Sequence, residues 1–231
     1  ILIIKIMGNN KIIVFANQKG GVGKTTLCIM FAHYLHSLGK NVYVIDADQQ
    51  LTVFDRRNDE LKQKAKDEEP FGVCAVNIKD KDEVIKAVEI AKNFDGIILI
   101  DTPGTITEDG LIPIFVNADA IVCPYDYETN TIKSTGVFIQ MMNILKGKFE
   151  KFHAKSFFVP NRVRKGQGIE DEKKFWSLSD SLFRGFGEVT PIIYDRVDIR
   201  RNSTMICKNE QLELVKEAFE YIMDKINKDN K

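Results

Sequence analysis

The sequence predicts an α/β fold, with a doubly wound, mostly parallel sheet flanked by helices on both faces. Short runs rich in isoleucine and valine recur along the chain, and each is followed by a longer segment with helical periodicity. The run Ile97-Ile98-Leu99-Ile100 is apolar on every residue rather than on alternate ones. Such a strand is buried on both faces, which is typical of a parallel sheet covered by helices.

The predicted strands and helices alternate over the whole length. Strands are expected at residues 11–17, 41–46, 71–77, 96–101, 120–124, 156–160 and 189–194. Helices are expected at residues 24–38, 53–68, 82–93, 109–116, 129–146, 170–183 and 209–226. Ligands of such sheets bind at the carboxyl ends of the strands, so the candidate functional residues are sought there.

The composition fits one globular domain. The chain has 231 residues, of which 44% are hydrophobic and 29% charged, and this excludes wholesale disorder. We expect a single domain over residues 1–231, in which residues 1–10 form a leader outside the folded part. Basic and acidic residues both number 33, so the chain is not a globally basic nucleic-acid coat protein. Any contact with a polyanion must come from a local patch.

The four cysteines are spread singly along the chain, without a CxxC pair. This spacing argues against a zinc ribbon or a four-cysteine cluster within one chain, and favours small buried thiols in a reducing cytosol. No apolar run reaches the roughly 18 to 20 residues that a membrane helix needs. We therefore expect a cytoplasmic protein without stable membrane association.

A phosphate-binding loop is the strongest motif in the chain. The segment Asn17-Gln18-Lys19-Gly20-Gly21-Val22-Gly23-Lys24-Thr25-Thr26 lies between a predicted strand and a predicted helix. Its glycines let the backbone aim N–H groups at an anion, and the helix adds its positive N-terminal end. In this pattern the lysine before the two threonines reaches the β- and γ-phosphates, and the first threonine hydroxyl ligates Mg²⁺. The sequence thus predicts that a nucleotide and Mg²⁺ are bound by Gly20, Gly21, Val22, Gly23, Lys24, Thr25 and Thr26.

Carboxylates follow two of the predicted strands. Asp46 and Asp48 come at the end of the second strand, and Asp101 comes at the end of the strand Ile97–Ile100. An aspartate that ends an apolar strand beside a phosphate loop is placed to hold Mg²⁺ or its waters. Asp48, Asp101 and Thr25 are therefore the candidate metal ligands.

The phosphate loop departs from the usual GxxxxGK[ST] pattern, because Gln18 replaces the first glycine and Lys19 is added. The pattern Lys-Gly-Gly-x-Gly-Lys-Thr-Thr resembles the hallmark of the ParA/MinD family of deviant Walker A ATPases. The resemblance implies a nucleotide-sandwich homodimer that forms on ATP binding. In it Lys19 touches the partner's phosphates, much as an arginine finger does.

The same resemblance implies roles for the carboxylates. Asp48 would orient the attacking water, so that Lys19, Lys24 and Asp48 are the expected catalytic residues, and Asp46 would support the switch loop. Gln49 stands where the family usually has proline, and the loss of that fixed φ angle is expected to loosen the loop. Residues 102–104 resemble the second switch.

The adenine site is expected at the end of a late strand. Asn161 and Arg162 resemble the base-reading element of the family, with Asn161 as the base contact. Residues 191–196 are the expected opposite wall of the base pocket. The reading of Asn161 as a simple turn residue stays open at this point.

Positive charge is concentrated in one part of this neutral chain. Between residues 130 and 168 eight Lys or Arg face one acid, Glu150, so this stretch carries +7. Such asymmetry can build a phosphate-binding face, although solvated helix surfaces explain it equally well. The resemblance implies non-specific DNA binding through basic residues of the carboxyl-terminal region. The expected DNA contacts are Arg200 and Arg201, followed by Arg164 and Lys165.

The resemblance points to a partition ATPase of the nucleoid. Its slow ATP hydrolysis would be stimulated by a ParB-like protein, and it would move a plasmid, a chromosome or a conjugative element. The last helix carries an apolar stripe and a polar face of mixed charge, so it is expected to dock on the sheet rather than on a membrane. A MinD-like membrane-associated positioning ATPase, a reductase of the nitrogenase iron-protein kind and an ATP-using ligase are the alternatives.

Overall fold

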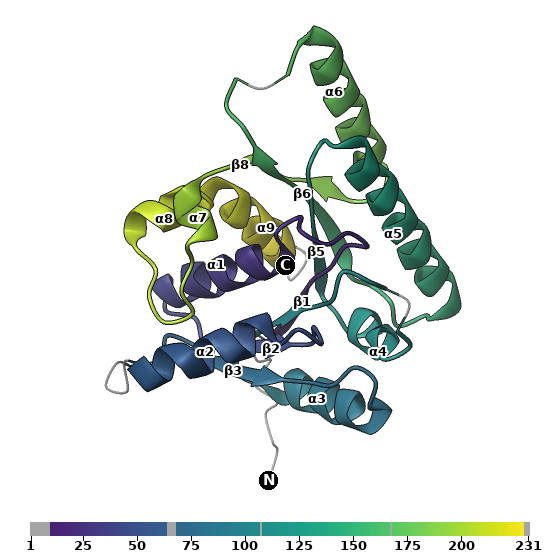
Figure 1. Cartoon of the computed structure of the whole chain (residues 1–231). Helices are drawn as coiled ribbons and strands as arrows, with labels where there is room; N and C mark the ends of the chain where they lie inside the picture. The colour runs from purple at the N-terminus through teal and green to yellow at the C-terminus, as the bar shows by residue number, and fades with distance from the viewer. Residues whose placement is uncertain (1–9, 64–67, 107, 167, 229–231) are drawn as a thin grey trace.

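The computed structural model describes residues 10–63, 68–106, 108–166 and 168–228, which form a parallel sheet covered by helices (Figure 1). The strand order is β3-β2-β4-β1-β5-β6-β7, and β8 pairs with the end of β6. Every pair of strands is parallel, so the predicted fold class is confirmed. The strands are β1 (Lys11–Phe15), β2 (Val42–Asp46), β3 (Gly72–Ala75), β4 (Ile97–Asp101), β5 (Ala120–Tyr125), β6 (Lys155–Val163), β7 (Glu188–Val189) and β8 (Ile193–Tyr194).

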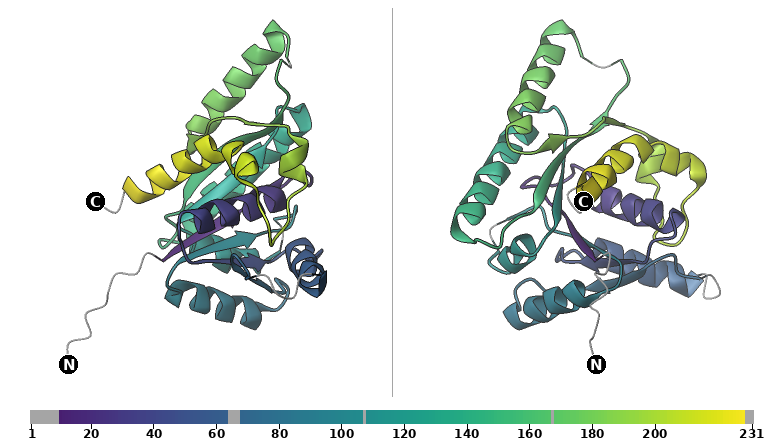
Figure 2. Two further views of the ribbon diagram at one scale, coloured as in Figure 1. Left: turned by 90° about the vertical axis from the view of Figure 1, so that its left-hand side faces the viewer. Right: turned by 180° about the vertical axis from the view of Figure 1, so that it is seen from behind.

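The helices divide between the two faces of the sheet, as both views of Figure 2 show. One core is built with α3 (Lys81–Asn93), α4 (Leu111–Val116), α5 (Thr129–Lys148) and α6 (Glu170–Arg184). The other is built with α1 (Lys24–Ser37), α2 (Thr52–Gln63), α7 (Val197–Arg200), α8 (Asn209–Glu213) and α9 (Lys216–Lys228). α1 is apolar on all sides because the sheet lies on one side of it and α9 on the other.

The register of the central strands brings the candidate site together. Phe15 of β1 lies beside Asp101 of β4, and Asp101 lies beside Asp46 of β2. The phosphate loop follows β1 directly, so the loop and both aspartates meet at one edge of the sheet. This edge is formed by the carboxyl ends of parallel strands, where the sequence predicts the ligand.

Three predicted elements differ from the structure. The last helix is two helices, since i→i+3 hydrogen bonds at Leu214 and Val215 tighten the chain between α8 and α9. The strand predicted at 189–194 is split into β7 and β8 by Pro191, which has no N–H for the ladder. The strand predicted at 156–160 continues to Val163.

Two other predictions reach beyond the described residues. The expected leader at 1–10 lies outside them except for Asn10, whose side-chain amide donates to the carbonyl oxygens of Ala91 and Phe94. The end of the helix predicted at 53–68 also lies partly outside them. Among the described residues, no helix is long and apolar enough to cross a membrane.

Candidate nucleotide-binding site

The phosphate loop turns back on itself between β1 and α1. Gly21 and Gly23 have φ angles of +80° and +99°, a left-handed conformation that residues with a Cβ rarely adopt. α1 begins at Lys24, so its positive end faces the loop. The Lys24 ammonium donates a hydrogen bond to the carbonyl oxygen of Lys19 at 3.2 Å and lies across the mouth of the loop.

A pocket of about 760 Å³ opens over this loop. Its walls are the phosphate loop and the loops that follow β2, β3 and β4. Val22 does not line it, because its side chain is buried beneath the loop. The predicted residues that do line it are Gly20, Gly21, Gly23, Lys24, Thr25, Thr26 and Asp48.

Asp101 is the most constrained carboxylate of the site. It ends β4 and is fully buried, and neither carboxylate oxygen has a hydrogen bond of ordinary geometry to another described residue. Burial raises the pKa of Asp101 to about 7, against the opposing effects of the Thr25 hydroxyl and the Lys24 charge. Two orphaned carboxylate oxygens beside a threonine hydroxyl fit Mg²⁺, which prefers oxygen ligands. A bound ion would supply positive charge to the phosphate oxygens.

Asp46 and Asp48 are used differently. Asp46 accepts hydrogen bonds from the backbone amides of Val53 at 2.8 Å and Phe54 at 3.1 Å, and so caps α2. Its other oxygen accepts from the amide of Asp48 at 3.2 Å. Asp48 is half-buried, accepts from the amide of Gln50 at 3.0 Å and lines the phosphate pocket. Asp46 therefore shapes the loop, and Asp48 is the one of these two carboxylates that lines the pocket.

The loop after β4 touches the phosphate loop. The Thr102 hydroxyl donates to the carbonyl oxygen of Phe15 at 2.9 Å. A Cβ placed on Gly104 would lie 3.2 Å from the backbone nitrogen of Gly20, so the two backbones run side by side. Any side chain at Gly104 would crowd the loop that meets the phosphates.

Asn161 and Arg162 hold the phosphate loop from the opposite side. The ladder between β6 and β8 is interrupted at Arg162, which has a φ angle of +61° and is therefore strained by about 1 kcal/mol. Its guanidinium donates to the carbonyl oxygen of Gly21. The Asn161 amide donates to the carbonyl oxygen of Val22 at 2.8 Å, and its nitrogen leaves no room for a Cβ on Gly23. Asn161 lies in a strand, so the turn interpretation is wrong.

A second pocket of about 250 Å³ adjoins this contact. Asn161, Arg162 and Thr26 form one wall, and Tyr194, Asp195 and Arg196 form the other, with Ile199 and Arg200 beside them. The expected opposite wall at 191–196 is thus brought to Asn161 through its last three residues. An aromatic ring, an aliphatic side chain and an amide oxygen are groups that can hold a planar base.

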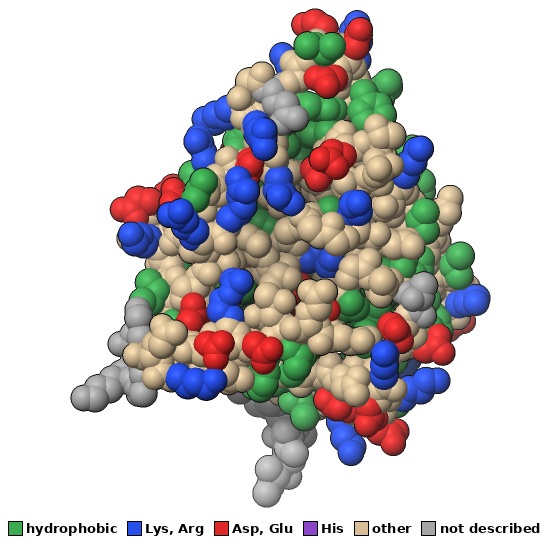
Figure 3. Space-filling model, in the orientation of Figure 1, with side chains coloured by type: hydrophobic (Ala, Val, Ile, Leu, Met, Phe, Trp, Pro, Cys, Tyr) green, Lys and Arg blue, Asp and Glu red, His purple; other side chains and the backbone are tan. Residues whose placement is uncertain are grey.

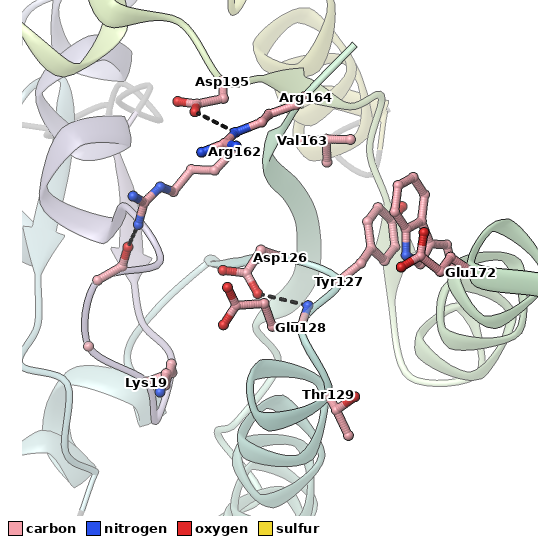
Figure 4. Close-up of a pocket in the computed structure, with 13 residues that line it drawn as sticks. Lys19, Asp126, Tyr127, Glu128, Thr129, Arg162, Val163, Arg164, Glu172 and Asp195 are labelled. Carbon is pink, nitrogen blue, oxygen red and sulfur yellow. Dashed lines mark hydrogen bonds and ion pairs between the residues drawn. The ribbon is translucent and has the colours of Figure 1, made fainter. Parts of the chain in front are cut away.

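Lys19 lies at the tip of the phosphate loop, on the rim of a third pocket of about 610 Å³ (Figure 4). Asp126, Glu128 and Thr129 line the pocket across from it, at the start of α5. No hydrogen bond or ion pair joins the Lys19 ammonium to another residue that the structure describes. Its cation is therefore not committed to a partner within the described part of the chain.

The four predicted DNA contacts lie on one surface next to the second pocket. Asp195 is at its centre, 3.0 Å from Arg200 and 3.8 Å from Arg164. The Lys165 ammonium lies over the ring of Tyr194, 5.3 Å from its centroid. We define the basic patch as the exposed residues Arg162, Arg164, Lys165, Arg196, Arg200 and Arg201. Figure 3 shows Lys and Arg gathered over β8 and α7.

The stretch 130–168 does not form a single basic face. Lys155 begins β6 and Val163 ends it, and eight steps of about 3.3 Å separate the two ends by roughly 26 Å. Lys146 and Lys148 lie in the last turn of α5, away from β8 (Figure 1). Only the end of the stretch joins Arg200 and Arg201.

Several residues of the site carry no signal in the sequence. Asn17 is fully buried and donates to Pro124 and Thr135, which ties the start of the phosphate loop to β5 and α5. The acids Asp126 and Glu128 reach the third pocket through the topology alone. The glycine-rich motif predicts the phosphate loop, but it does not identify the distant side chains that hold the loop in place.

The four cysteines, all within the described residues, are free thiols. Cys28 and Cys123 are buried, and Cys74 and Cys207 are half-buried. Within the described ranges, no group of three or more His, Cys, Asp or Glu side chains is close enough to hold a metal ion. Burial raises the pKa of the Cys123 thiol, so it stays protonated near neutral pH.

Most of the chain matches a known family of nucleotide-binding domains. Residues 13–203 match the family described as the CobQ/CobB/MinD/ParA nucleotide binding domain. A 38-residue segment, 16% of the chain, is 60% identical to the chromosome-partitioning ATPase Soj of Thermus thermophilus. The match spans only 15% of that relative's length.

Solved structures resemble the chain over nearly its full length. A plasmid partition protein of Borrelia burgdorferi bound to AMPPNP has a TM-score of 0.72 and 17% identity, covering 93% of this chain and 99% of that one. The MinC:MinD cell division complex of Aquifex aeolicus gives 0.67 and 21%, covering 93% and 96%. A pNOB8 ParA bound to nonspecific DNA gives 0.63 and 16%, covering 94% and 97%. At these identities the likeness establishes the fold.

The family match covers the phosphate loop, the carboxylates after β2 and β4, and the end of β6. Geometry and family agree on a nucleotide site at the carboxyl edge of the sheet. The chain belongs to the CobQ/CobB/MinD/ParA nucleotide-binding domain family.

Proposed function

We propose that this chain is a partition ATPase that dimerises on ATP, binds DNA non-specifically and moves a plasmid, a chromosome or a conjugative element. The observation that carries the proposal is the shared surface of the nucleotide pockets and the basic patch. Arg162 and Arg200 belong to the patch and also line the pocket at Asn161. A change in the nucleotide would therefore be felt directly at the surface that meets DNA.

The proposed nucleotide site follows from the geometry of the phosphate loop. The loop amides and Lys24 bind the phosphate chain, and Thr26 lies where the two pockets meet. Thr25, Asp101 and Asp48 hold Mg²⁺ directly or through water. Asp48 faces the pocket and accepts a hydrogen bond from the attacking water, which orients it. Asn161 and Arg162 hold the base against Tyr194.

Lys19 is proposed to act on a second copy of the chain. Its own pocket is already served by Lys24, which lies across the loop. The uncommitted ammonium at the loop tip is available to a neighbouring active site. A cation delivered there stabilises charge on the transferring phosphoryl group, as in finger-type systems. Binding of ATP to two facing copies then closes the dimer.

DNA binding is proposed for the basic patch. Five cationic side chains of the patch lie around Asp195 and the neighbouring Tyr194, and phosphate contacts of this kind give affinity without sequence preference. The pNOB8 ParA structure was obtained with nonspecific DNA, and the Borrelia burgdorferi protein is a plasmid partition protein. A ParB-like partner would stimulate hydrolysis and release the DNA. Such a protein would work in the cytoplasm, on the nucleoid.

A MinD-like membrane role has less support. The apolar stripe of the last helix, Val215, Phe219, Ile222 and Ile226, is buried against α1 and β6. Its exposed face mixes acids and lysines, whereas helices that lie on membranes have a basic polar face.

The proposal is tested by binding to DNA of arbitrary sequence. We expect binding with ATP, little with ADP, and none by Lys24→Ala, because that variant loses its hold on the phosphates. Lys40→Ala, which removes an exposed lysine after α1, is the matched control. Binding that is absent, or equal with and without ATP, would reject the partition role. Retention on anionic lipid vesicles in its place would favour the MinD-like role.

A further inference from the structure

A short segment after α7 is fastened to both helices that flank the nucleotide site. Residues 202–205, which we call the strap, run between α1 and α2. His33 of α1 makes a hydrogen bond to the carbonyl oxygen of Ser203 at 2.8 Å. The remaining contacts come from Asn202 and Thr204. Loops of this length are usually surface connections, so this density of side-chain hydrogen bonds calls for a physical explanation.

Thr204 is locked to α2 through all of its polar groups. It is fully buried, and both its amide and its hydroxyl donate to Glu60, at 2.8 and 2.5 Å. The hydroxyl also accepts from Arg57 at 3.0 Å, and the carbonyl oxygen accepts from Arg57 at 2.8 Å. Arg57 is itself 2% exposed. Arg57 also donates to Glu69 at 2.6 Å, so Thr204 joins a network that is already charge-paired. Breaking the Thr204 contacts would leave buried polar groups without a hydrogen bond, which couples the strap to α2.

Asn202 joins α2 to α1, the helix that begins at the phosphate loop. Its side-chain oxygen accepts from Arg56 of α2 at 2.7 Å, and its carbonyl oxygen accepts from the same nitrogen at 3.1 Å. Its side-chain amide donates to the carbonyl oxygen of Thr26 at 3.3 Å. Thr26 lines both nucleotide pockets. Asn202 is thus the bridge in the strap between the two helices.

Both ends of this connection reach functional surfaces. α2 is capped by Asp46 and follows the loop that carries Asp48, so the loop and the helix start are one unit. At the other end, Arg200 and Arg201 directly precede Asn202. A displacement of the Asp48 loop by a γ-phosphate would be passed by α2 to the strap, and by the strap to the two arginines.

We propose that Asn202 is a positioning residue for ATP hydrolysis, and that the strap carries the nucleotide-dependent position of α2 to Arg200 and Arg201. Asn202 acts by holding α1, with Thr25 and Thr26, in register with the loop of Asp48. The part that concerns DNA rests on the proposed function. The part that concerns hydrolysis rests on the proposed ATPase activity and the proposed role of Asp48, whereas the exchange of the strap amides needs only nucleotide binding.

The test compares Asn202→Ala with the wild type in the full chain. For the wild type we expect slower hydrogen exchange of the strap amides with AMPPNP than with ADP. In Asn202→Ala this difference should vanish, and kcat should fall about 3- to 30-fold while the KM for ATP stays within about twofold. Asn209→Ala is the matched control, since Asn209 is exposed on α8 nearby.

Two further variants separate positioning from loss of fold. Asn202→Asp keeps an acceptor for Arg56 but turns a carboxylate toward the Thr26 carbonyl. Its kcat should therefore fall as that of Asn202→Ala does. Arg56→Ala removes the same contact from the other side, and its effect should not add to that of Asn202→Ala. Circular dichroism and the unfolding midpoint identify any variant that fails to fold.

The outcomes discriminate between the two proposals. The proposal for the strap is overturned if the strap amides of the wild type exchange hydrogen equally fast with both nucleotides. It is also overturned if kcat is unchanged in Asn202→Ala and Arg56→Ala. Failure of the wild type to bind DNA in any nucleotide state overturns the partition role, while exchange and kcat still decide the strap. When DNA is bound, Asn202→Ala should bind it about equally with ATP and ADP.

Discussion

Two ionisable residues of the nucleotide site are buried where their charged forms are disfavoured. Burial lowers the pKa of Lys24 and raises the pKa of Asp101 to about 7, so each charge is disfavoured where it lies. The phosphates of ATP would provide the anion that Lys24 lacks, and Mg²⁺ would provide the cation that Asp101 lacks. The site is therefore built for a ligand that carries both charges.

Removal of Lys19 should separate binding from turnover. Lys19→Ala keeps the loop backbone and Lys24, so affinity for ATP should stay within a few-fold of the wild type. Turnover should collapse by on the order of 10³-fold or more, because the cation for the partner's phosphoryl group is lost. Steady-state hydrolysis and nucleotide binding measure the two, with Lys40→Ala as the control. Normal turnover by Lys19→Ala would remove the proposed role of this residue.

A buried histidine should make stability depend on pH. Burial of His33 lowers its pKa to about 4, against about 6.5 in an unfolded chain. The charges of Arg57 and Glu60 act on it with opposite sign and smaller effect. Between pH 6.5 and 4 the unfolded chain takes up a proton that the folded chain refuses. The free energy of unfolding should therefore fall by about 2 kcal/mol from pH 7 to pH 5 through this group.

Urea unfolding at pH 7 and pH 5 checks this contribution. His33→Gln should lose most of the pH dependence, whereas His36→Gln, at an exposed position one turn away, should keep it. An equal loss of stability at pH 5 in His33→Gln and the wild type would contradict the assignment.

At the residue scale the sequence predicted what local spacing encodes. Gly20 to Thr26, Asp48 and Asp101 follow strands in a recognisable pattern, and the strand register brings them together. Arg162 could not be predicted to hold Gly21, because a bulge in β6 decides where its side chain points. Contacts between distant segments, such as that of Asn202 with Thr26, depend on packing that no local pattern records.

Among the elements, α1 and α9 pack together through aromatic rings. Phe219 of α9 is fully buried, with its ring centroid 4.6 Å from that of Phe31 and 5.7 Å from that of Tyr34. α1 carries the phosphate residues at its start, so α9 supports the site from behind. The apolar stripe predicted docking on the sheet, and α9 contacts β6 as well as α1. The break before Lys216 has no glycine or proline to mark it.

Truncation of this ring should weaken the whole domain. Phe219→Ala should lower the free energy of unfolding by about 3 to 5 kcal/mol, because it removes a buried aromatic side chain and leaves a cavity. Phe175→Ala, the same change at an exposed position on α6, should cost much less. Thermal or urea unfolding of both variants gives the comparison. Similar losses in the two would show that α9 is not packed as described.

For the whole molecule, the arrangement of charge matters more than its sum. The formal net charge is zero, yet Lys and Arg side chains gather over β8 and α7, and Arg162, Arg196 and Arg200 line the nucleotide pocket at Asn161 (Figure 3). The alternation of strands and helices predicted the sheet and its functional edge. The basic face could not be predicted from the charged stretch at 130–168, because β6 carries the two ends of that stretch apart.

DNA affinity should follow position rather than net charge. Replacement of Arg200 and Arg201 by alanine should weaken ATP-dependent DNA binding, and should reduce the slope of log affinity against log salt by about 1 per lost phosphate contact. The same charge change is made at the far end of α5 by Lys146→Ala together with Lys148→Ala. This change should leave the DNA affinity and the salt slope nearly unaltered. Equal effects of the two pairs of substitutions would contradict DNA binding by the basic patch.

The central claim is that two copies close on ATP, and the mass of the particle tests it most directly. Light scattering of the wild type, with a chain mass of 26.3 kDa, should give a doubled mass with AMPPNP and Mg²⁺ and a single mass with ADP. Lys24→Ala should remain single in both. A wild type of unchanged mass under saturating AMPPNP would contradict the account.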